Sequence, residues 1–371
     1  MDIVTIVLAF LFVPFESQFI THEVFPLTGE CVISSEKFST YRHYFAVSPD
    51  GDRVAFINSR QQTVQSYDLA EGNTSTVASH SDTARTAWGF TKRQADTLYF
   101  SGPVDDIADQ GRRPNEVNIP IAIRFDRSGE LLVSDAGNRR VTMFDRSLAF
   151  ETSFLLPSNM SAPSDMRVVA GGNYLLGNRL LDSTQAINAG YHCNVLYPTG
   201  KLLQSFAYTP KIAFDRNLWL GVYSLFDLDE RGNVYVAFTV EPIIYVYNNT
   251  YELTTTFGEI PEWWIGPPVL EQSRFSLRSE PDNFDGSWTR LIGVVYSGDG
   301  KLILCTETNG LIEGCSKPYI LDIYNTDGTL LVGGIESDYL PVGVDSDNMI
   351  YFLSVTGDRL IRTSFAEGAD E

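Results

Sequence analysis

Histidine is scarce in this sequence, and the positions of the histidines do not suggest a metal site. The 371 residues include four histidines, at positions 22, 43, 80 and 192. No two of them keep the short spacing that zinc ligands on one loop or helix show. His192 is the one that we expect in a long loop, between Tyr191 and Cys193. Tyr191 and His192 are therefore candidate ligand-binding residues, with ordinary loop residues as the alternative.

Acidic clusters and nucleophile motifs give no stronger signal. Asp105, Asp106 and Asp109 are spaced i, i+1 and i+4, whereas an EF-hand loop follows D-x-[DN]-x-[DN]-G. A solvated acidic loop explains these residues better than a calcium site does. The sequence also lacks the G-x-S-x-G turn of the α/β-hydrolases. We therefore predict no catalytic residues, no metal ligands and no cofactor, and we favour a protein that is not an enzyme.

An aromatic-rich segment at 258–289 is the strongest candidate for a binding surface. It holds P-E-W-W-I-G-P-P at 261–268 and three of the five tryptophans of the chain. Aromatic rings provide large, rigid contact areas that suit sugars and protein partners. Packing of the segment onto the fold is the alternative, and we favour it for Trp264 and Trp288. Trp263 is kept as a candidate ligand-binding residue.

The four cysteines do not form a recognisable metal or redox motif. Cys31, Cys193, Cys305 and Cys315 are scattered, and none of them belongs to a C-x-x-C pair. Cys305 and Cys315 flank a loop between two expected strands, so they could close that loop as a disulfide. Structural thiols are the alternative.

Short strands must position these residues, because no long pattern with a helical period is present. The clearest unit covers 121–156. It contains four short runs with alternating or continuous apolar residues, which are typical of strands. The runs lie at 121–125, 131–134, 141–145 and 152–156 and are separated by turn residues such as D-R-S-G at 126–129 and D-A-G-N at 135–138. The unit is therefore predicted to be one antiparallel sheet.

A single sheet of this kind has two unpaired edges and cannot bury both faces. Weaker copies of the unit begin near residues 44, 86, 121, 166, 225, 292 and 342, and such self-similarity is the signature of a propeller. Packing the copies around an axis buries their faces and leaves only short edges. We predict an all-β propeller of four-stranded antiparallel blades. Six blades are favoured, and seven are possible if 84–101 forms a blade of its own.

Parts of the chain resemble known propeller families. The run I-A-I-x-F-D-x-S-G-x-L-L-V-S-D-A-G-N-R-R-V-x-x-F-D at 121–145 resembles an NHL-type blade. S-P-D-G-D-R-V-A-F-I at 48–57 resembles the turn of a TolB-type blade, and 111–116 is similar to the linker of bacterial six-bladed propeller proteins. The resemblance implies the fold and says little about function.

The same resemblance bears on the run D-x-x-N-x-R that begins at Asp135. It implies a mostly structural role, in which the Asp135 and Asn138 side chains cap turn amides and the arginine bridges blades. Arg139, at the expected channel mouth, could instead hold an anionic ligand, because its guanidinium suits carboxylates and phosphates. Arg139 is therefore a candidate ligand-binding residue.

The ends of the chain are expected to differ from the single propeller domain at 20–366. Residues 3–15 are nearly all apolar, too short to span a bilayer and similar to the core of a signal peptide. No basic residue precedes them. We treat 1–19 as a possible leader, which places the protein in the periplasm or outside the cell, with the cytoplasm as the alternative and an apolar first strand as the competing interpretation. The mature chain is expected to have no membrane span, and the acidic tail at 367–371 is expected to be disordered.

The first ordered segment has a second predicted role. The last unit, from 342, shows only three strands. A strand drawn from 20–40 could supply the fourth, which would close the ring.

The charge balance limits the partners. The formal net charge is −20, so phosphate backbones and anionic lipid surfaces are repelled. Nucleic acid is therefore not expected as a partner, and we expect a monomer.

The long segments are expected to lie on one face of the ring. They are 101–119, 177–194, 208–221, 258–289 and 306–318. In propellers, connections between the second and third strands, and between successive blades, leave the same face. We therefore predict a non-catalytic binding or scaffold module that presents this face to a protein, peptide or glycan. The alternative is a metal-dependent hydrolase, lactonase or lyase with its site at the axial channel, and only that alternative would involve calcium.

Overall fold

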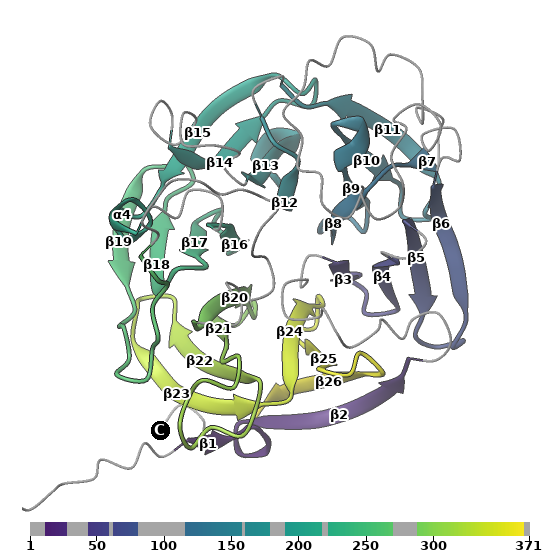
Figure 1. Ribbon diagram of the computed structural model, residues 1–371. Helices are drawn as coiled ribbons and strands as arrows, with labels where there is room; N and C mark the ends of the chain where they lie inside the picture. The colour runs from purple at the N-terminus through teal and green to yellow at the C-terminus, as the bar shows by residue number, and fades with distance from the viewer. Residues whose placement is uncertain are drawn as a thin grey trace, which may run out of the picture.

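Six antiparallel sheets are arranged radially around a central axis in the computed structural model (Figure 1). The structure describes residues 12–27, 44–58, 62–80, 116–157, 160–178, 190–216, 222–269 and 288–366. Within these residues the fold is a six-bladed β-propeller, which confirms the predicted class and the favoured blade number. Residues 84–101, on which the seven-blade alternative rested, lie outside the described part of the chain.

The blades follow one another along the chain, and each begins with its innermost strand. Blade 1 contains β3 (Phe45–Val47), β4 (Arg53–Asn58), β5 (Thr63–Asp68) and β6 (Thr74–His80), with β7 (Glu116–Val117) parallel to β6. Blade 2 contains β8 (Pro120–Phe125), β9 (Leu131–Asp135), β10 (Arg140–Phe144) and β11 (Phe150–Leu155). Blade 3 contains β12 (Pro163–Val169), β13 (Asn173–Asn178), β14 (Tyr191–Leu196) and β15 (Leu202–Tyr208).

The second half of the ring repeats this order and takes in the N-terminal strands. Blade 4 contains β16 (Ser224–Leu228), β17 (Val234–Phe238), β18 (Glu241–Tyr247) and β19 (Leu253–Phe257). Blade 5 contains β20 (Arg290–Tyr296), β21 (Lys301–Glu307), β22 (Tyr319–Asn325) and β23 (Leu330–Ser337), with β1 (Val13–Pro14) parallel to β23. Blade 6 contains β24 (Tyr339–Val344), β25 (Ile350–Ser354), β26 (Arg359–Phe365) and β2 (Phe19–Pro26).

Burial explains why these runs form blades. The second strands β9, β17 and β25 are buried along their whole length, because each lies inside its sheet and between two neighbouring blades. The outer strand β19 is exposed at four of its five residues. The core is therefore divided into apolar layers between adjacent blades, such as the layer in which blade 4 residues pack against blade 5 residues.

Aspartates at the ends of three inner strands set the first turns of blades 2, 4 and 6. The Oδ1 atom of Asp126 accepts hydrogen bonds from the N–H groups two and four residues later, and Asp229 and Asp345 repeat this pattern. Gly129 and Gly232 follow in the left-handed region, with φ of 89° and 80°. Since glycine adopts positive φ without a steric penalty, the D-x-x-G spacing fixes where these strands turn back.

The N-terminal segment closes the ring, as its sequence predicted. β2 pairs antiparallel with β26 and supplies the fourth strand of blade 6 (Figure 1). β1 pairs with β23 of blade 5, and the short helix η1 (Phe15–Ser17) links the two strands. Phe15 and Phe19 are buried, and their rings lie 5.0 Å from that of Phe352 in β25. We call β1, η1 and β2 the N-terminal clasp. Residues 13–19 of the possible leader thus belong to the propeller.

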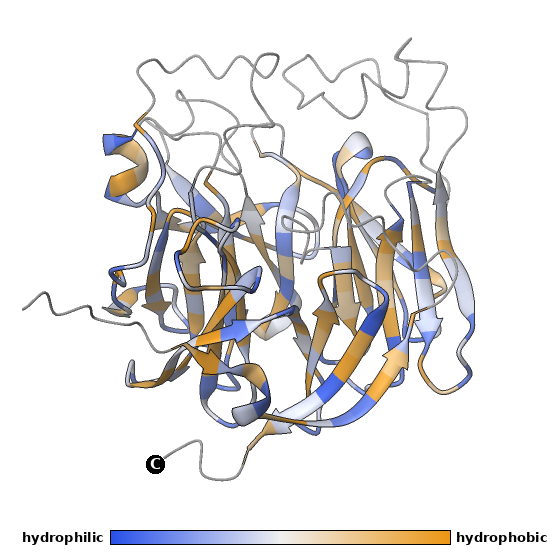
Figure 2. Ribbon diagram, turned by 60° about the horizontal axis from the view of Figure 1, so that its bottom comes forward, coloured by the Kyte–Doolittle hydropathy of each residue, from blue (hydrophilic) through white to orange (hydrophobic). Residues whose placement is uncertain are grey.

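The strand order also assigns the connections to two ends of the ring. All inner strands run in one direction, so the connections from second to third strands and from each blade to the next leave from one end. We call this end the loop-rich face, and Figure 2 shows helix α4 (Lys211–Asp215), which joins blades 3 and 4, there. The opposite end carries the short turns. Among the described residues, no helix has the length and apolar character needed to cross a membrane.

Candidate functional site

The inner strands carry an ordered row of charges near the axis. Arg124 of blade 2 pairs with Asp165 of blade 3 at 3.2 Å, and both side chains are buried. Arg167 of blade 3 contacts Asp165 at 3.4 Å and Asp227 of blade 4 at 2.8 Å. Asp227 also accepts a hydrogen bond from the backbone N–H of Tyr296 in blade 5. This hub chain links four consecutive blades.

The hub chain uses the carboxylates that an axial metal site would need. Asp165 and Asp227 are the two acidic residues on the six inner strands, and each already faces at least one guanidinium. Arg290, at the start of β20, pairs with Glu307 of β21 at 2.6 Å, and both are buried. Across the described ranges, no group of three or more His, Cys, Asp or Glu side chains is placed to hold a metal ion.

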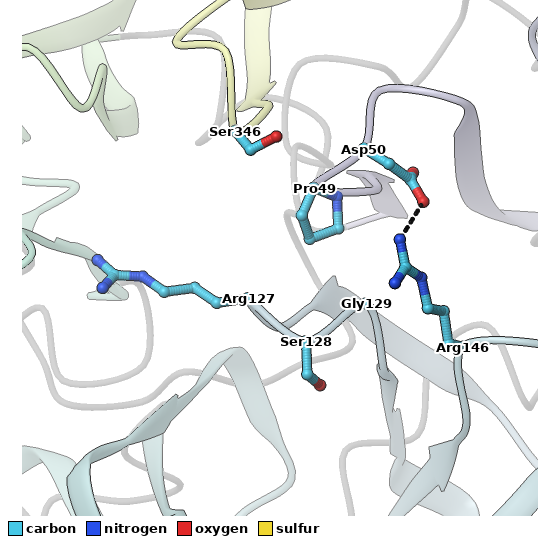
Figure 3. A pocket seen from close by; sticks show the side chains of 7 residues that line it. All are labelled: Pro49, Asp50, Arg127, Ser128, Gly129, Arg146 and Ser346. Atoms are coloured by element: carbon cyan, nitrogen blue, oxygen red, sulfur yellow. Dashed lines mark hydrogen bonds and ion pairs between the residues drawn. The ribbon is translucent and has the colours of Figure 1, made fainter.

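The short-turn face is bridged across the axis. Arg127 of blade 2 reaches Asp229 of blade 4, where its guanidinium donates to the backbone carbonyl at 3.1 Å. It passes blade 3, whose inner turn, Ala170–Gly172, contains two glycines. Figure 3 shows the shallow pocket beside Arg127, which is lined by Pro49, Asp50, Arg127, Ser128, Gly129, Arg146 and Ser346. An ion pair between Asp50 and Arg146 crosses one side of it.

The loop-rich face presents exposed apolar side chains on a fixed support. Ile260, Ile265 and Val269 are 57%, 38% and 57% exposed, and Trp263 between them is half-buried. We call these four residues the apolar ridge. They lie on the segment that leaves β19 of blade 4 toward blade 5.

Three contacts hold the ridge segment. Trp264 packs into the apolar layer between blades 4 and 5. Ile265 is hydrogen-bonded to Thr289, which lies just before β20. The Ile265 N–H donates to the Thr289 hydroxyl oxygen at 3.1 Å, and the Thr289 N–H donates to the Ile265 carbonyl at 2.9 Å. The ring of Phe257, at the end of β19, lies 5.6 Å from that of Tyr324 in β22. The ridge is therefore anchored to the inner strand of blade 5 and to β22.

A second group of exposed rings lies beside α4. The ring of Tyr208 stacks on Phe214 at 5.8 Å and meets Tyr191 edge-on at 5.6 Å. Tyr191 and Tyr208 are 42% and 49% exposed. Gly190 has φ of 55°, and a Cβ there would lie 2.2 Å from the Tyr208 ring, so only glycine fits beneath it.

His192 does not lie in a face loop, so its expected place was wrong. The strand begins earlier than expected, at Tyr191, which places His192 inside β14 with none of its surface exposed. Its Nε2 atom is 3.1 Å from the Thr209 hydroxyl, and its ring packs on Phe238 of blade 4. His192 therefore fills the interface between blades 3 and 4, whereas its neighbour Tyr191 faces solvent.

Arg139 and its neighbours hold backbone groups. Arg139 donates to the carbonyls of Pro157 and Met160, at the connection from blade 2 to blade 3. Asp135 accepts from the Asn118 N–H, the Asn138 amide and Arg140, each at 2.8 Å. Burial raises the pKa of Asp135, and the Arg140 charge opposes that rise. This geometry supports the structural role that the NHL resemblance implied, and an anion at Arg139 stays a prediction.

Cys305 and Cys315 are thiols in the structure, so the possible disulfide between them is not formed and the alternative of structural thiols applies. Cys305 lies in the middle of β21 and is buried in the core between blades 5 and 6. The Cys315 thiol lies in the following loop and donates to the Lys317 carbonyl at 3.4 Å. The longer strand β21 places Cys305 inside the sheet rather than at the mouth of the loop.

The tryptophans of 258–289 divide as their sequence suggested. Trp288 is 1% exposed and packs in the core between blades 3 and 4, and Trp264 packs between blades 4 and 5. Trp263 is half-buried, with its ring 6.3 Å from that of Trp264. The packing interpretation is therefore confirmed for the first two, and Trp263 remains available for contacts.

The aliphatic members of the ridge were missed in the sequence. Ile260, Ile265 and Val269 look like ordinary core residues in a linear pattern. Their exposure depends on the path of the segment, which is decided by the contact of Ile265 with Thr289 and of Phe257 with Tyr324. The nearby prolines were the one available signal that the segment is not a strand.

Comparisons with known proteins place the chain in a fold class. No family model and no curated protein matches the sequence. A member of the DUF4221 family from Bacteroides vulgatus is 10% identical, with 94% of this chain and 97% of that chain covered and a TM-score of 0.54. A putative exported protein from Bacteroides fragilis is 11% identical, with 96% and 97% covered and a TM-score of 0.54.

An enzyme also lies among the similar structures, with a lower TM-score. A gluconolactonase from Xanthomonas campestris is 13% identical, covers 94% of this chain and 99% of its own, and has a TM-score of 0.49. These likenesses show the fold alone. The chain is a six-bladed β-propeller similar to bacterial propellers, and its likeness to NHL-type and TolB-type blades stays a resemblance.

Proposed function

We propose that this protein is a non-catalytic binding module that presents its loop-rich face to a protein, peptide or glycan. The apolar ridge is the observation that carries the proposal. Its aliphatic side chains are exposed although the segment beneath them is pinned to blade 5. Groups of exposed apolar side chains that are rimmed by polar residues are common at surfaces that another molecule covers.

The arrangement of charges at the axis favours binding over metal-dependent hydrolysis. A calcium ion needs six to eight oxygen ligands, several of them carboxylates. Asp165 and Asp227 are paired with Arg124 and Arg167, so a cation there would have to break those pairs and lie near two guanidinium groups. Repulsion by these arginines makes the hub a poor site for a divalent cation.

The test is selection of ligands that depend on the ridge. A random peptide display library and a glycan array are screened on the wild-type protein, on Trp263→Ala and on Leu253→Ala. Leu253 is a matched control, because it is 54% exposed at the other end of β19 in the same blade. We expect ligands that lose about tenfold or more in affinity with Trp263→Ala, as for a central interface aromatic, and that tolerate Leu253→Ala.

Two results would overturn the proposal. One is a set of ligands that bind the Trp263 and Leu253 variants equally well. The other is hydrolysis of a lactone panel that requires added calcium and is abolished by Asp227→Asn, since that outcome would place the working site at the axis.

A further inference from the structure

We infer that the partner of the apolar ridge is a basic peptide segment, with lysine or arginine side chains next to aliphatic or aromatic ones. This inference rests on the proposed function and narrows its ligand class. It follows from the charges that accompany the ridge, from the rigidity of its support and from the kind of surface it offers.

Two glutamates are interleaved with the ridge. Glu259 precedes Ile260 and Glu262 precedes Trp263, and both glutamates are exposed. Glu262 and Trp263 form the tip of a turn that is closed by a hydrogen bond from the Trp264 N–H to the Pro261 carbonyl at 2.9 Å. Acidic and apolar groups thus alternate over a few residues.

These glutamates are not neutralised within the described ranges, where neither takes part in an ion pair. Lysines of the same face are engaged elsewhere: Lys211 pairs with Asp215, and Lys317 pairs with Asp338. The net charge of −20 adds a long-range field of the same sign. A cationic partner is therefore attracted to the ridge, and an anionic one is repelled.

The support makes the ridge suitable for a short ligand. Binding costs free energy for each side chain or loop that must be ordered, and a pre-ordered surface avoids part of that cost. Trp264 in the blade 4–5 layer and the Ile265–Thr289 hydrogen bonds order the ridge before any ligand arrives. Most of the free-energy cost of ordering would then come from the flexible peptide and not from the ridge.

The surface chemistry favours a peptide over a glycan. Sugars are held by aromatic faces combined with side chains that donate and accept hydrogen bonds. Beside its two glutamates, the ridge offers one half-buried indole and three aliphatic side chains, and these aliphatic groups match the apolar side chains of a peptide better than the hydroxyl groups of a sugar.

The test uses three synthetic peptides of equal length and the intact protein. One alternates lysine with leucine, one lysine with serine, and one glutamate with leucine. Dissociation constants are measured by calorimetry for the wild type, for the double variant Glu259→Gln/Glu262→Gln and for Asp52→Asn. Asp52 is an exposed carboxylate on the short-turn face and serves as the charge control. Circular dichroism checks that each variant is folded.

We expect the lysine–leucine peptide to bind most tightly. The double glutamine variant should weaken it by about three- to tenfold, because exposed ion pairs are individually weak. Raising the salt concentration should weaken wild-type binding more than binding to that variant. Asp52→Asn should change nothing.

The inference is overturned if the glutamate–leucine peptide binds as well as the lysine–leucine peptide, or if the double variant binds like the wild type. In either case the proposed function still holds if the display library yields peptides whose binding depends on Trp263. The loop-rich face would then bind ligands through its apolar groups and not through its charge. Loss of Trp263 dependence in both experiments would remove the proposed function as well.

Discussion

Asp322 is a buried carboxyl group, and none of the ion pairs among the described residues includes it. It lies in β22, opposite a bulge of β23, where Gly333 and Gly334 face it in place of one residue. Its Oδ1 atom accepts the Gly334 N–H at 2.8 Å, and Gly334 has φ of 73°. Burial raises the pKa of Asp322 to about 6, and this single hydrogen bond opposes the rise only in part.

This pKa predicts a pH-dependent contribution to stability. Because the folded-state pKa lies above the ordinary value of 3.8, the native state binds the proton more tightly. The stabilisation of the folded state by the protonated Asp322 is complete below pH 3.8 and is lost as the pH rises through about 6. Asp322→Asn should therefore raise the free energy of unfolding by roughly 2–3 kcal/mol at pH 8, with little effect at pH 4. Urea denaturation of both proteins at several pH values measures the difference; a difference that does not vary with pH would contradict the prediction.

The N-terminal clasp is the element that makes the ring closed. Without β2, blade 6 would have three strands and an open edge along β26. Open edges pair with other chains, so closure protects against aggregation as well as adding stability. The clasp also reaches blade 5 through β1, which ties two blades from outside.

Removing one ring from the clasp tests its contribution. Phe19 is 3% exposed and contacts Phe15, Phe352 and Phe365. Phe19→Ala should lower the free energy of unfolding by about 3–5 kcal/mol, as for other buried phenylalanines. Ile20→Ala is the control, because Ile20 is exposed on the same strand. Chemical denaturation of both variants measures the effect, and equal losses for the two would show that the clasp is not packed as described.

The same packing bears on leader processing. A cut after residue 19 would remove β1, η1 and Phe19 from the propeller. For an exported form we therefore expect any cleavage to lie before Val13. Mass spectrometry of the mature chain measures where the cleavage lies.

At the scale of the whole molecule, the ion pairs that join blades differ in burial, and we call Arg146–Asp50 on the short-turn face the rim pair. The hub pair Arg167–Asp227 has side chains that are 15% and 14% exposed, whereas Arg146 of the rim pair Arg146–Asp50 is 68% exposed. Solvent screens the rim pair, while loss of a hub partner leaves a nearly buried charge poorly compensated.

The two pairs should therefore differ when one partner is removed. We expect Asp227→Asn to cost about 1.5–3 kcal/mol of unfolding free energy, the range for a hydrogen bond to a charged group. Arg146→Gln should cost less than about 1 kcal/mol. Guanidinium chloride would mask the charges, so urea is the denaturant of choice. A larger effect at the rim would mean that the hub chain does not couple the blades.

The sequence by itself determined the architecture. Strand length, alternation and D-x-x-G turns are local properties, and the stretch at 121–156 contained all of them, so the blade and the ring that follows from its unpaired edges could be predicted. The missing fourth strand of the last unit even pointed to the N-terminal segment. The six-blade count was favoured because 84–101 shows only two strand-like runs, which is half of a unit.

Only the tertiary structure decided which side chains face outward. Tyr191 and His192 are neighbours in one strand, yet only Tyr191, the first residue of β14, is exposed, because the five residues that follow it are all buried inside the propeller. Ile260 and Ile265 are exposed because contacts with Thr289 and Tyr324 of blade 5 fix the path of their segment. Exposure depends on these contacts between distant residues, and a linear pattern contains no information about them.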